Sequence, residues 1–297
     1  MSTSTPATPL SSATSDSSGD PLDTDAVSLA SLFAQGAITA AEHTERVLER
    51  ARERGPQVGA FASLAEDLSR SQAERADANR HKADAKRVNA DSASLAGVPF
   101  PIKDLTEVEG LPFEAGSLAL SGNVSARTDG VARRLLEAHT VPIGKTTTSE
   151  FGMSVFSESA SCAPARTPWD TSRTAGGSSG GAGAAVASGI VPIAHGNDAG
   201  GSVRVPAACN GIAGMVAGRG LIGWGPHGLD GIGLARHGAL ARTIADVATG
   251  LDLLAHEQPG DHFPRPQPVQ PLADAARSGA RDILSLIHIS EPTRPRL

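Results

Sequence analysis

The stretch "TAGGSSGGAGAAVASG" at residues 174–189 constrains the fold more than any other part of the chain, because four glycines and two serines occupy six consecutive positions. Such a run is usually a flexible spacer. Here, however, residues 182–188 are small and apolar and are followed by Gly189, which predicts a buried helix that ends at a glycine. The run also lacks the lysine and the glycine spacing of nucleotide-binding loops. A linker and a phosphate-binding loop are therefore disfavoured, and the third interpretation, the floor of an active site, depends on the other segments of the chain.

Helical patterns precede this stretch. Thr39 and Glu42 form a capping-box pattern at the start of "TAAEHTERVLERARERG", and Gly55 followed by Pro56 predicts the end of that helix. Residues 60–90 are rich in Ala, Asp, Glu and Arg and predict further amphipathic helix.

Apolar runs alternate with helical patterns from residue 95 onward. "LAGVPFPIKDL" at 95–105 predicts a buried strand that opens into a loop. A helix capped by Asp129 is followed by a strand around 141–143, and "GIVPIAHGND" at 189–198 predicts another strand that leads into glycines. This alternation of strands and helices predicts an α/β fold.

The two ends of the chain differ in composition from its middle. Residues 1–22 are rich in Ser, Thr, Pro and Asp and predict a disordered leader. "LSLIHISEPTR" at 284–294 resembles the translated transposon-end adapter of DNA sequencing libraries, so we expect the natural reading frame to be lost near residue 283. The expected organisation is the leader, the N-terminal part of a single domain at 23–283, and a non-native tail at 284–297.

Composition excludes several classes of protein. The net charge of −6 argues against a general nucleic-acid binder, which needs a basic face. The sequence has no apolar run of about 18 residues and no signal-peptide pattern, so no membrane segment or secretion signal is expected. Two cysteines, Cys162 and Cys209, give neither a metal-binding spacing nor a disulfide framework. We expect a cytoplasmic protein that uses no cofactor and no metal.

The glycine-rich run also matches G-x-S-x-G, the nucleophile turn of α/β-hydrolases, with Ser178 as the nucleophile. Asp198 and His237 follow in the chain order that such a triad requires. That turn must follow a strand, however, and the preceding "PWDTSRTA" is polar and turn-like. An α/β-hydrolase with Ser178 as nucleophile therefore stands as an alternative.

Three separated segments carry a closer resemblance: "GVPFPIKDL" at 97–105, "GGSSGG" at 176–181 and "GNDAGGSVRVPAACNG" at 196–211. With these segments in this order, the chain resembles the amidase signature family from about residue 25 to about residue 255. The resemblance implies a mixed β-sheet flanked by helices, incomplete at its C-terminus. It also implies hydrolysis of the C–N bond of a small-molecule amide. The family includes the A-type subunits of aminoacyl-tRNA amidotransferases, so an amidotransferase subunit of this type, or an inactive fragment, is the alternative.

The same resemblance implies a catalytic triad of Lys103, Ser178 and Ser202, with a cis peptide bond before Ser178. A serine hydroxyl needs a base within hydrogen-bond reach before it can attack an amide. Lys103 can serve only if it is uncharged, which requires burial without a carboxylate partner. We therefore expect the side chain of its neighbour Asp104 to point elsewhere.

Other residues are given supporting roles. The expected oxyanion hole consists of the backbone N–H groups of Ala199, Gly200 and Gly201. The resemblance implies that Arg204 anchors the loop after the nucleophile, and His195 is interpreted as a hydrogen-bonded core histidine. The remaining supporting or substrate-contacting candidates are Gly177, Ser179, Met153 and Cys209. No nucleic-acid or membrane partner is expected, and a homodimer is one expected assembly.

Overall fold

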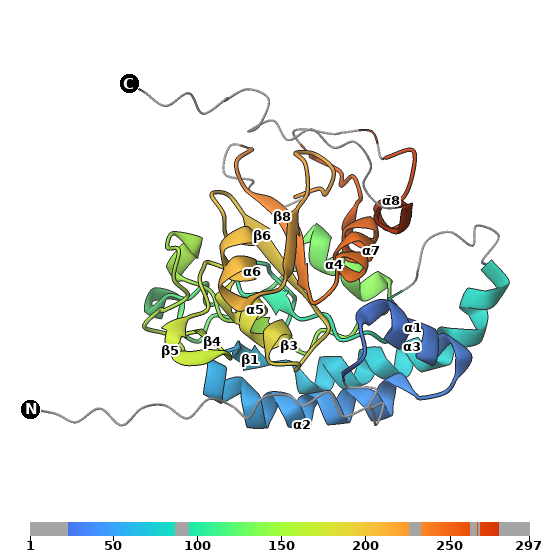
Figure 1. Cartoon of the computed structure of the whole chain (residues 1–297), viewed down its shortest axis with the longest axis horizontal. Coiled ribbons are helices and arrows are strands. Elements are labelled where there is room, and N and C mark those ends of the chain that lie inside the picture. Colours follow the sequence, from blue (N-terminus) through green and yellow to red (C-terminus); the bar gives the residue numbers. More distant parts are fainter. Residues whose placement is uncertain (1–22, 87–94, 226–232, 262–265, 267, 279–297) are drawn as a thin grey trace, which may run out of the picture.

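The computed structural model describes residues 23–86, 95–225, 233–261, 266 and 268–278 (Figure 1). The expected leader at 1–22 and the expected tail at 284–297 lie outside these residues. None of the helices in the described part of the chain is both long enough and apolar enough to cross a membrane.

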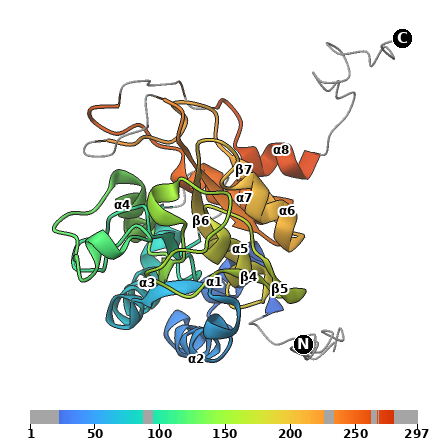
Figure 2. The same cartoon turned by 90° about the vertical axis from the view of Figure 1, so that its left-hand side faces the viewer.

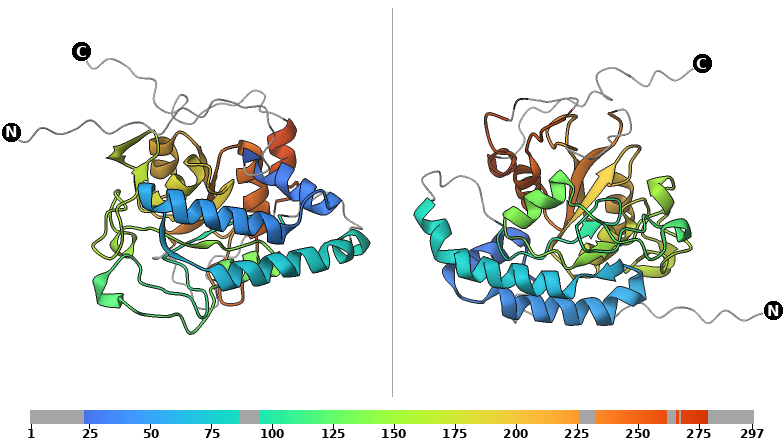
Figure 3. Two further views of the ribbon diagram at one scale, coloured as in Figure 1. Left: turned by 90° about the horizontal axis from the view of Figure 1, so that it is seen from below. Right: turned by 180° about the vertical axis from the view of Figure 1, so that it is seen from behind.

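The helices of the described chain fall mainly at its two ends, with shorter ones between the strands. The α-helices run Ala26–Gln35 (α1), Ala40–Val58 (α2), Glu66–Lys86 (α3), Gly130–Glu137 (α4), Gly180–Ala187 (α5), Arg204–Asn210 (α6), Ile244–Leu254 (α7) and Leu272–Ser278 (α8). Two single turns of 3-10 helix cover Leu118–Leu120 (η2) and Glu150–Gly152 (η3). Figure 3 shows α2 and α3 side by side along one face of the molecule.

The strands form three small sheets within the described residues. They run Phe61–Leu64 (β1), Ile102–Lys103 (β2), Gly144–Thr146 (β3), Arg166–Thr167 (β4), Asp170–Thr174 (β5), Ile193–Asp198 (β6), Ala213–Val216 (β7) and Arg236–Ala241 (β8). Their orders are β1-β3-β2, β4-β5 and β6-β8-β7. Because β2 is parallel to β3 while β1 is antiparallel to it, the first sheet is mixed, and the α/β fold class is confirmed.

The capping box predicted at Thr39 is present, since the Thr39 hydroxyl accepts the Glu42 N–H and donates to the Glu42 carboxylate. The predicted end of this helix is wrong. The chain continues through Pro56 to Val58 and stops at Gly59, whose φ of 58° lies in the left-handed region. A proline so near the C-terminus removes only one helical hydrogen bond, and Val58 is fully buried.

Further differences concern short elements. Residues 60–90 are not all helical, because β1 precedes α3 and pairs with β3 across 80 residues of sequence. The strand predicted around 141–143 lies directly after those residues, as β3, which begins at Gly144. Asp129 does stand before α4, but its carboxylate accepts the Glu107 N–H instead of capping the helix.

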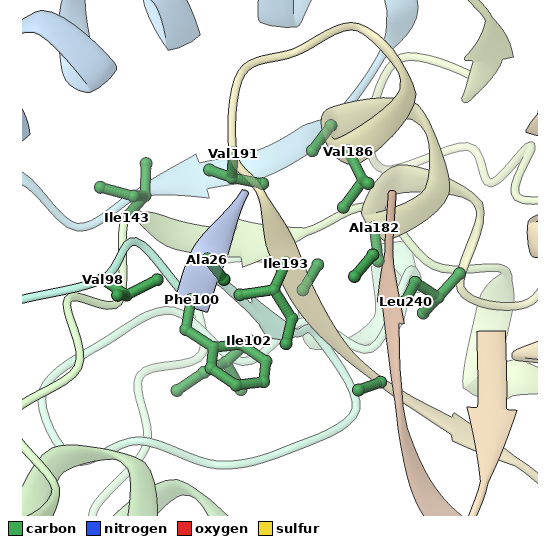
Figure 4. Close-up of a cluster of buried hydrophobic side chains, with 14 of the residues drawn as sticks. Ala26, Val98, Phe100, Ile102, Ile143, Ala182, Val186, Val191, Ile193 and Leu240 are labelled. Carbon is green, nitrogen blue, oxygen red and sulfur yellow. The ribbon is translucent and has the colours of Figure 1, made fainter. Parts of the chain in front are cut away.

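The apolar core lies between the β6–β8 strand pair and the segments that carry β2 and β3. Figure 4 shows Phe100, Ile102, Ile193 and Leu240 meeting there with small side chains of α5. In α5 itself, residues 180–186 are all buried. A Cβ on Gly181 would lie 2.4 Å from both the Ala60 oxygen and the Thr147 nitrogen, so only glycine permits this approach.

The glycine-rich run therefore forms the buried start of α5 and is not a linker. Strand β6, predicted from "GIVPIAHGND", pairs with β8 along its whole length from Ile193 opposite Ala241 to Asp198 opposite Arg236. Figure 2, turned by 90°, shows β6 and β7 with α7 packed near them. The carboxyl end of β6 and the start of α5 thus meet where the candidate site lies.

Candidate active site

Lys103 lies at the end of β2 with no exposed surface. Its Nζ atom is 2.7 Å from Ser178 Oγ and 2.7 Å from Asn197 Oδ1. The Asn197 carbonyl oxygen is also within reach, at 3.4 Å. Three segments that are far apart in sequence therefore converge on one buried amine.

Burial lowers the pKa of Lys103 to about 7, and the more distant Asp198 carboxylate only partly opposes this effect. The adjacent Asp104 does not pair with Lys103. It forms an ion pair with Lys145 instead, with 2.8 Å between Lys145 Nζ and Asp104 Oδ1, and both side chains are buried. As expected, the Asp104 side chain points elsewhere, so Lys103 has no carboxylate in contact and a large fraction of it is uncharged near neutral pH.

Ser178 follows a cis peptide bond from Gly177. A Cβ on Gly177 would lie 2.7 Å from the Phe156 backbone nitrogen, so glycine permits the close approach of these two chain segments. The Ser157 hydroxyl donates to the Ser178 carbonyl oxygen at 3.0 Å and fixes the main chain at this point.

Ser202 is partly exposed and follows Gly201, whose φ of 130° is reserved for glycine. Its carbonyl oxygen accepts the Ser179 N–H at 3.1 Å, which joins the loop after β6 to the start of α5. Within the described chain, the Ser202 hydroxyl makes no hydrogen bond. The Lys103–Ser178 contact is therefore formed in this structure, and the Ser178–Ser202 contact is not.

Asp198 organises the loop that carries Ser202. Its carboxylate accepts the N–H groups of Gly201 at 2.7 Å, Val203 at 3.0 Å and Arg204 at 3.3 Å. It also accepts hydrogen bonds from two nitrogens of the Arg204 guanidinium, Nη2 at 2.9 Å and Nε at 3.0 Å. Burial by itself raises the pKa of Asp198, but these donors outweigh it and hold that pKa well below its ordinary value.

The contact from Gly201 alters the expected oxyanion hole, because its N–H already donates to Asp198. The N–H groups of Ala199 and Gly200 have no partner in the described structure, and both residues are exposed. A Cβ on Gly200 would meet nothing within 4 Å, so there is open space beside this backbone. Two of the three expected donors are therefore free.

The supporting candidates lie around this loop. Ser179 donates its hydroxyl to the Asn197 carbonyl oxygen at 3.3 Å, so it links β6 to α5. Met153 is 87% exposed and belongs to an apolar loop with Phe151, Val155 and Phe156. This loop is near Ser178, because a Cβ on Gly152 would lie 3.4 Å from Ser178 Oγ.

The other two candidates lie on α6. Arg204 is anchored on Asp198, and its side chain is about half exposed. Cys209 is an exposed, free thiol beside Gly176.

The α/β-hydrolase alternative is not supported by the contacts. Asp198 is occupied by Arg204 and the backbone, while His237 Nδ1 lies 3.0 Å from His195 Nε2. In the described chain neither residue forms a hydrogen bond with Ser178. The same residues contain no cluster of three or more His, Cys, Asp or Glu that could hold a metal.

The roles of two residues were not predicted from the sequence, although Asp198 was considered there as a member of the alternative α/β-hydrolase triad. Asn197 contacts Lys103 Nζ directly, and Asp198 shapes the Ser202 loop. The only signal for either residue is that both lie in the segment "GNDAGGS" at 196–202 that carried the resemblance.

Comparisons with known proteins identify the family to which the chain is similar. The family model described as "Amidase" matches residues 42–284. A putative amidase of Synechocystis sp. is 37% identical over 250 residues, which cover 84% of this chain and 49% of that relative. The A-type subunit of glutamyl-tRNA(Gln) amidotransferase from Chloroflexus aggregans is 40% identical over 242 residues, covering 80% of this chain and 47% of the relative.

Among solved structures, 6-aminohexanoate cyclic dimer hydrolase complexed with substrate matches with a TM-score of 0.75 and 33% identity. The match covers 85% of this chain and 50% of that one. The chain thus spans about half the length of the curated relatives it matches.

Proposed function

Since this chain belongs to the amidase signature family, we propose that it carries the catalytic residues of an amidase that hydrolyses the C–N bond of a carboxylic amide. The observation that carries the proposal is the buried Lys103 amine, 2.7 Å from the Ser178 hydroxyl, with no carboxylate in contact. A base of this kind is uncharged over a useful range of pH, which an exposed lysine is not.

In the proposed cycle, uncharged Lys103 takes a proton from Ser178 as Ser178 takes one from Ser202. This step requires a hydrogen bond between the hydroxyls of Ser202 and Ser178, and Ser202 is partly exposed at the start of the cycle. Ser202 Oγ then bonds to the amide carbon, and the resulting oxyanion is held by the N–H groups of Ala199 and Gly200.

Collapse of that intermediate breaks the C–N bond, and the leaving amine receives the proton held by Lys103 and Ser178. Water then loses a proton to the same pair and attacks the acyl-enzyme. Collapse of this second intermediate breaks the bond between the acyl carbon and Ser202 Oγ, the pair returns the proton to Ser202, and the acid is released. No oxidant, metal or cofactor is needed for this balance of atoms.

The exposed apolar loop that contains Phe151, Met153, Val155 and Phe156 supports a further part of the proposal, namely contact with the substrate. It adjoins Ser178 through Gly152, so it can hold an apolar portion of the amide next to the nucleophile. Among the other candidates, Gly177 and Ser179 support the Ser178 turn, and Arg204 supports the Ser202 loop.

A fluorophosphonate reagent tests the assignment without requiring the natural substrate, because it bonds to activated serines. We expect it to label Ser202, as located by mass spectrometry of peptides. Labelling should disappear in Ser202→Ala and fall at least 100-fold, to order of magnitude, in Lys103→Ala. Ser172→Ala, on exposed β5, serves as the control and should label like the unmodified chain.

Label found on Ser178, and retained in Ser202→Ala, would overturn the assignment and favour the α/β-hydrolase alternative. An amidotransferase A-type subunit is the second candidate, supported by the likeness to the Chloroflexus protein. It predicts that amide hydrolysis appears only when partner chains are added. Both free cysteines fit a cytoplasmic location, and the homodimer stays a prediction.

A further inference from the structure

Two buried histidines, His195 and His237, lie next to the Lys103 backbone on the side that faces β6. The Lys103 N–H points to His195 Nδ1 at 3.4 Å, and His195 Nε2 lies 3.0 Å from His237 Nδ1. Both rings are fully enclosed. The His237 ring is in turn stacked on Trp224, with 3.9 Å between ring centroids.

The His195 ring takes the place of a missing strand contact. Strand β2 pairs with β3 on one side, and on its other side the His195 N–H donates to the Pro101 oxygen at 3.0 Å. Two residues after Pro101, at Lys103, no backbone group of β6 accepts the N–H. The His195 ring accepts it instead. A buried N–H without a partner is costly, so this ring is a structural requirement for the backbone that carries Lys103.

Strand geometry places a second contact on the same side of β6. Residues two apart on a strand share a face, so His195 and Asn197 both face Lys103. His195 holds its main chain, and Asn197 holds its amine. His237 lies on the neighbouring strand β8, where it is paired with Asn197 of β6, and its ring contacts the His195 ring.

The contacts fix which ring nitrogens carry protons. Because the Lys103 N–H is a donor, His195 Nδ1 has to be an unprotonated acceptor, and the single His195 proton lies on Nε2. That proton then needs an acceptor at His237 Nδ1, so His237 also carries its proton on Nε2. A proton added at either Nδ1 would place two donors face to face.

We propose that His195 and His237 form an uncharged pair whose role is to position Lys103 for catalysis. This inference rests on the proposed function, because it assigns the pair to the base of that reaction. The titratable groups that act on the pair are Lys103 from β2 and Lys145 from β3. The charged form of either lysine disfavours a positive charge on His195, and that of Lys103 disfavours one on His237. Burial also lowers the pKa of both rings, that of His237 to about 3.

Trp224 closes the open side of this pair. Its backbone N–H, together with that of Gly225, donates to Asp261 Oδ1 at 2.8 Å, which fixes the segment after β7. The stacked indole thereby covers His237.

Nitrogen NMR of the full chain labelled with ¹⁵N-histidine tests the pair without any activity. The two signals are assigned by their loss in His195→Asn and His237→Asn. We expect both rings to remain uncharged with the proton on Nε2 from about pH 8 down to about pH 5. A charged ring at about pH 6, or a His195 proton on Nδ1, would overturn the proposal.

Substitutions test the positioning role through the rate at which fluorophosphonate labels Ser202. His195→Leu should slow labelling by about 30-fold, because the Lys103 backbone loses its acceptor. His195→Asn places an oxygen near the Nδ1 position and should recover the rate to within about 3-fold, whereas His195→Gln should not. His43→Asn removes a buried imidazole from α2 and controls for a general loss of packing.

Thermal melting of each variant shows whether it is folded, and if His195→Leu is not, the Asn and Gln variants decide the question. Equal rates in these two variants would refute the positioning role. If the unmodified chain does not label at all, the proposed function fails while NMR still decides the state of the pair. If it labels and His195→Leu labels equally fast, the positioning proposal alone fails.

Discussion

The side-chain oxygen of Asn197 lies 2.7 Å from the Lys103 nitrogen, the same distance that separates this nitrogen from the Ser178 hydroxyl. An uncharged amine has two N–H groups and one lone pair. The two oxygens of Asn197, one on its side chain and one on its main chain, can accept both N–H groups. The lone pair is then left for the Ser178 O–H, which is the direction of transfer that a base requires.

The first prediction concerns the pH dependence of the reaction. Since burial lowers the pKa of Lys103 to about 7, the amine is charged below that pH and uncharged above it. The rate of Ser202 labelling by fluorophosphonate should therefore rise with pH, through an apparent pKa of about 7, to a plateau. A rate that does not change between about pH 5 and about pH 9 would contradict this role for Lys103.

The second prediction follows from the position of Asn197. Asn197→Asp places a negative charge beside Lys103 and stabilises its charged form, which raises its pKa. The rising limb of the labelling profile should move to higher pH by at least about one unit, so the rate at about pH 7 should fall at least about 5-fold. Asn79→Asp, on the surface of α3, adds the same charge outside the site and should leave the profile in place. An unshifted profile in Asn197→Asp would show that this oxygen does not face the base.

The third prediction concerns the loop that carries Ser202. In Asp198→Asn, five donors would meet an uncharged amide instead of a carboxylate. The free energy of unfolding, measured in urea at neutral pH, should fall by about 3 kcal/mol. Because the pKa of Asp198 lies below its ordinary value in the folded chain, its contribution is complete above about pH 4 and is lost as pH falls further. The difference between the two proteins should therefore shrink in strong acid.

Asp170→Asn provides the matched control for that measurement. Asp170 also pairs with an arginine, Arg173, but both side chains are well exposed. Its substitution should change the free energy of unfolding by less than about 1 kcal/mol. Equal effects at the two positions would mean that Asp198 does not organise its loop.

The fourth prediction concerns the buried ion pair of Lys145 and Asp104. Lys145→Met leaves the enclosed Asp104 carboxylate without its positively charged partner, and the free energy of unfolding should fall by about 3–5 kcal/mol. The double variant Lys145→Met with Asp104→Leu removes both charges and should recover most of that loss. Urea titration of the two single variants and the double variant measures the coupling.

This ion pair also has a predicted pH dependence. Burial raises the pKa of Asp104 although Lys145 opposes it. A carboxyl group whose pKa is raised by folding binds a proton more tightly in the folded chain than in the unfolded chain. The destabilising effect of burying this group therefore decreases as the pH falls and the group becomes protonated. The loss in Lys145→Met should therefore be smaller at about pH 5 than at about pH 8. A loss that does not depend on pH would contradict an unpaired carboxylate at this position.

Much of the site could be predicted because its residues lie in segments with a strong local pattern. The glycine-rich run, the strand leading to Lys103 and the strand leading to Asp198 were all expected at the sequence level, and the structure brings their ends together. Contacts within a loop, such as those between Asp198 and Arg204, depend on a few consecutive residues and need no knowledge of distant partners.

The missed contacts depend on pairing over long distances. His237 meets His195 only because β8 pairs with β6 in one particular register, with Asn197 opposite His237. Strand β1 has four residues, too few for a periodic pattern, and it forms because β3 offers it a partner. Likewise, α2 continues beyond Pro56 because Val58 becomes buried there. This burial depends on tertiary packing, so helix propensity alone does not predict it.

The small side chains of helix α5 limit which residues of this chain can be substituted. Apart from Val186, its residues 180–187 carry no side chain larger than a methyl group, so they have no rotamers to change. A larger residue here would collide with the main chain of neighbouring segments, as at Gly181. If the chain has the proposed activity, this helix can hardly be altered to fit a different substrate, and changes in preference have to arise in other parts of the protein, such as the exposed loop that contains Met153.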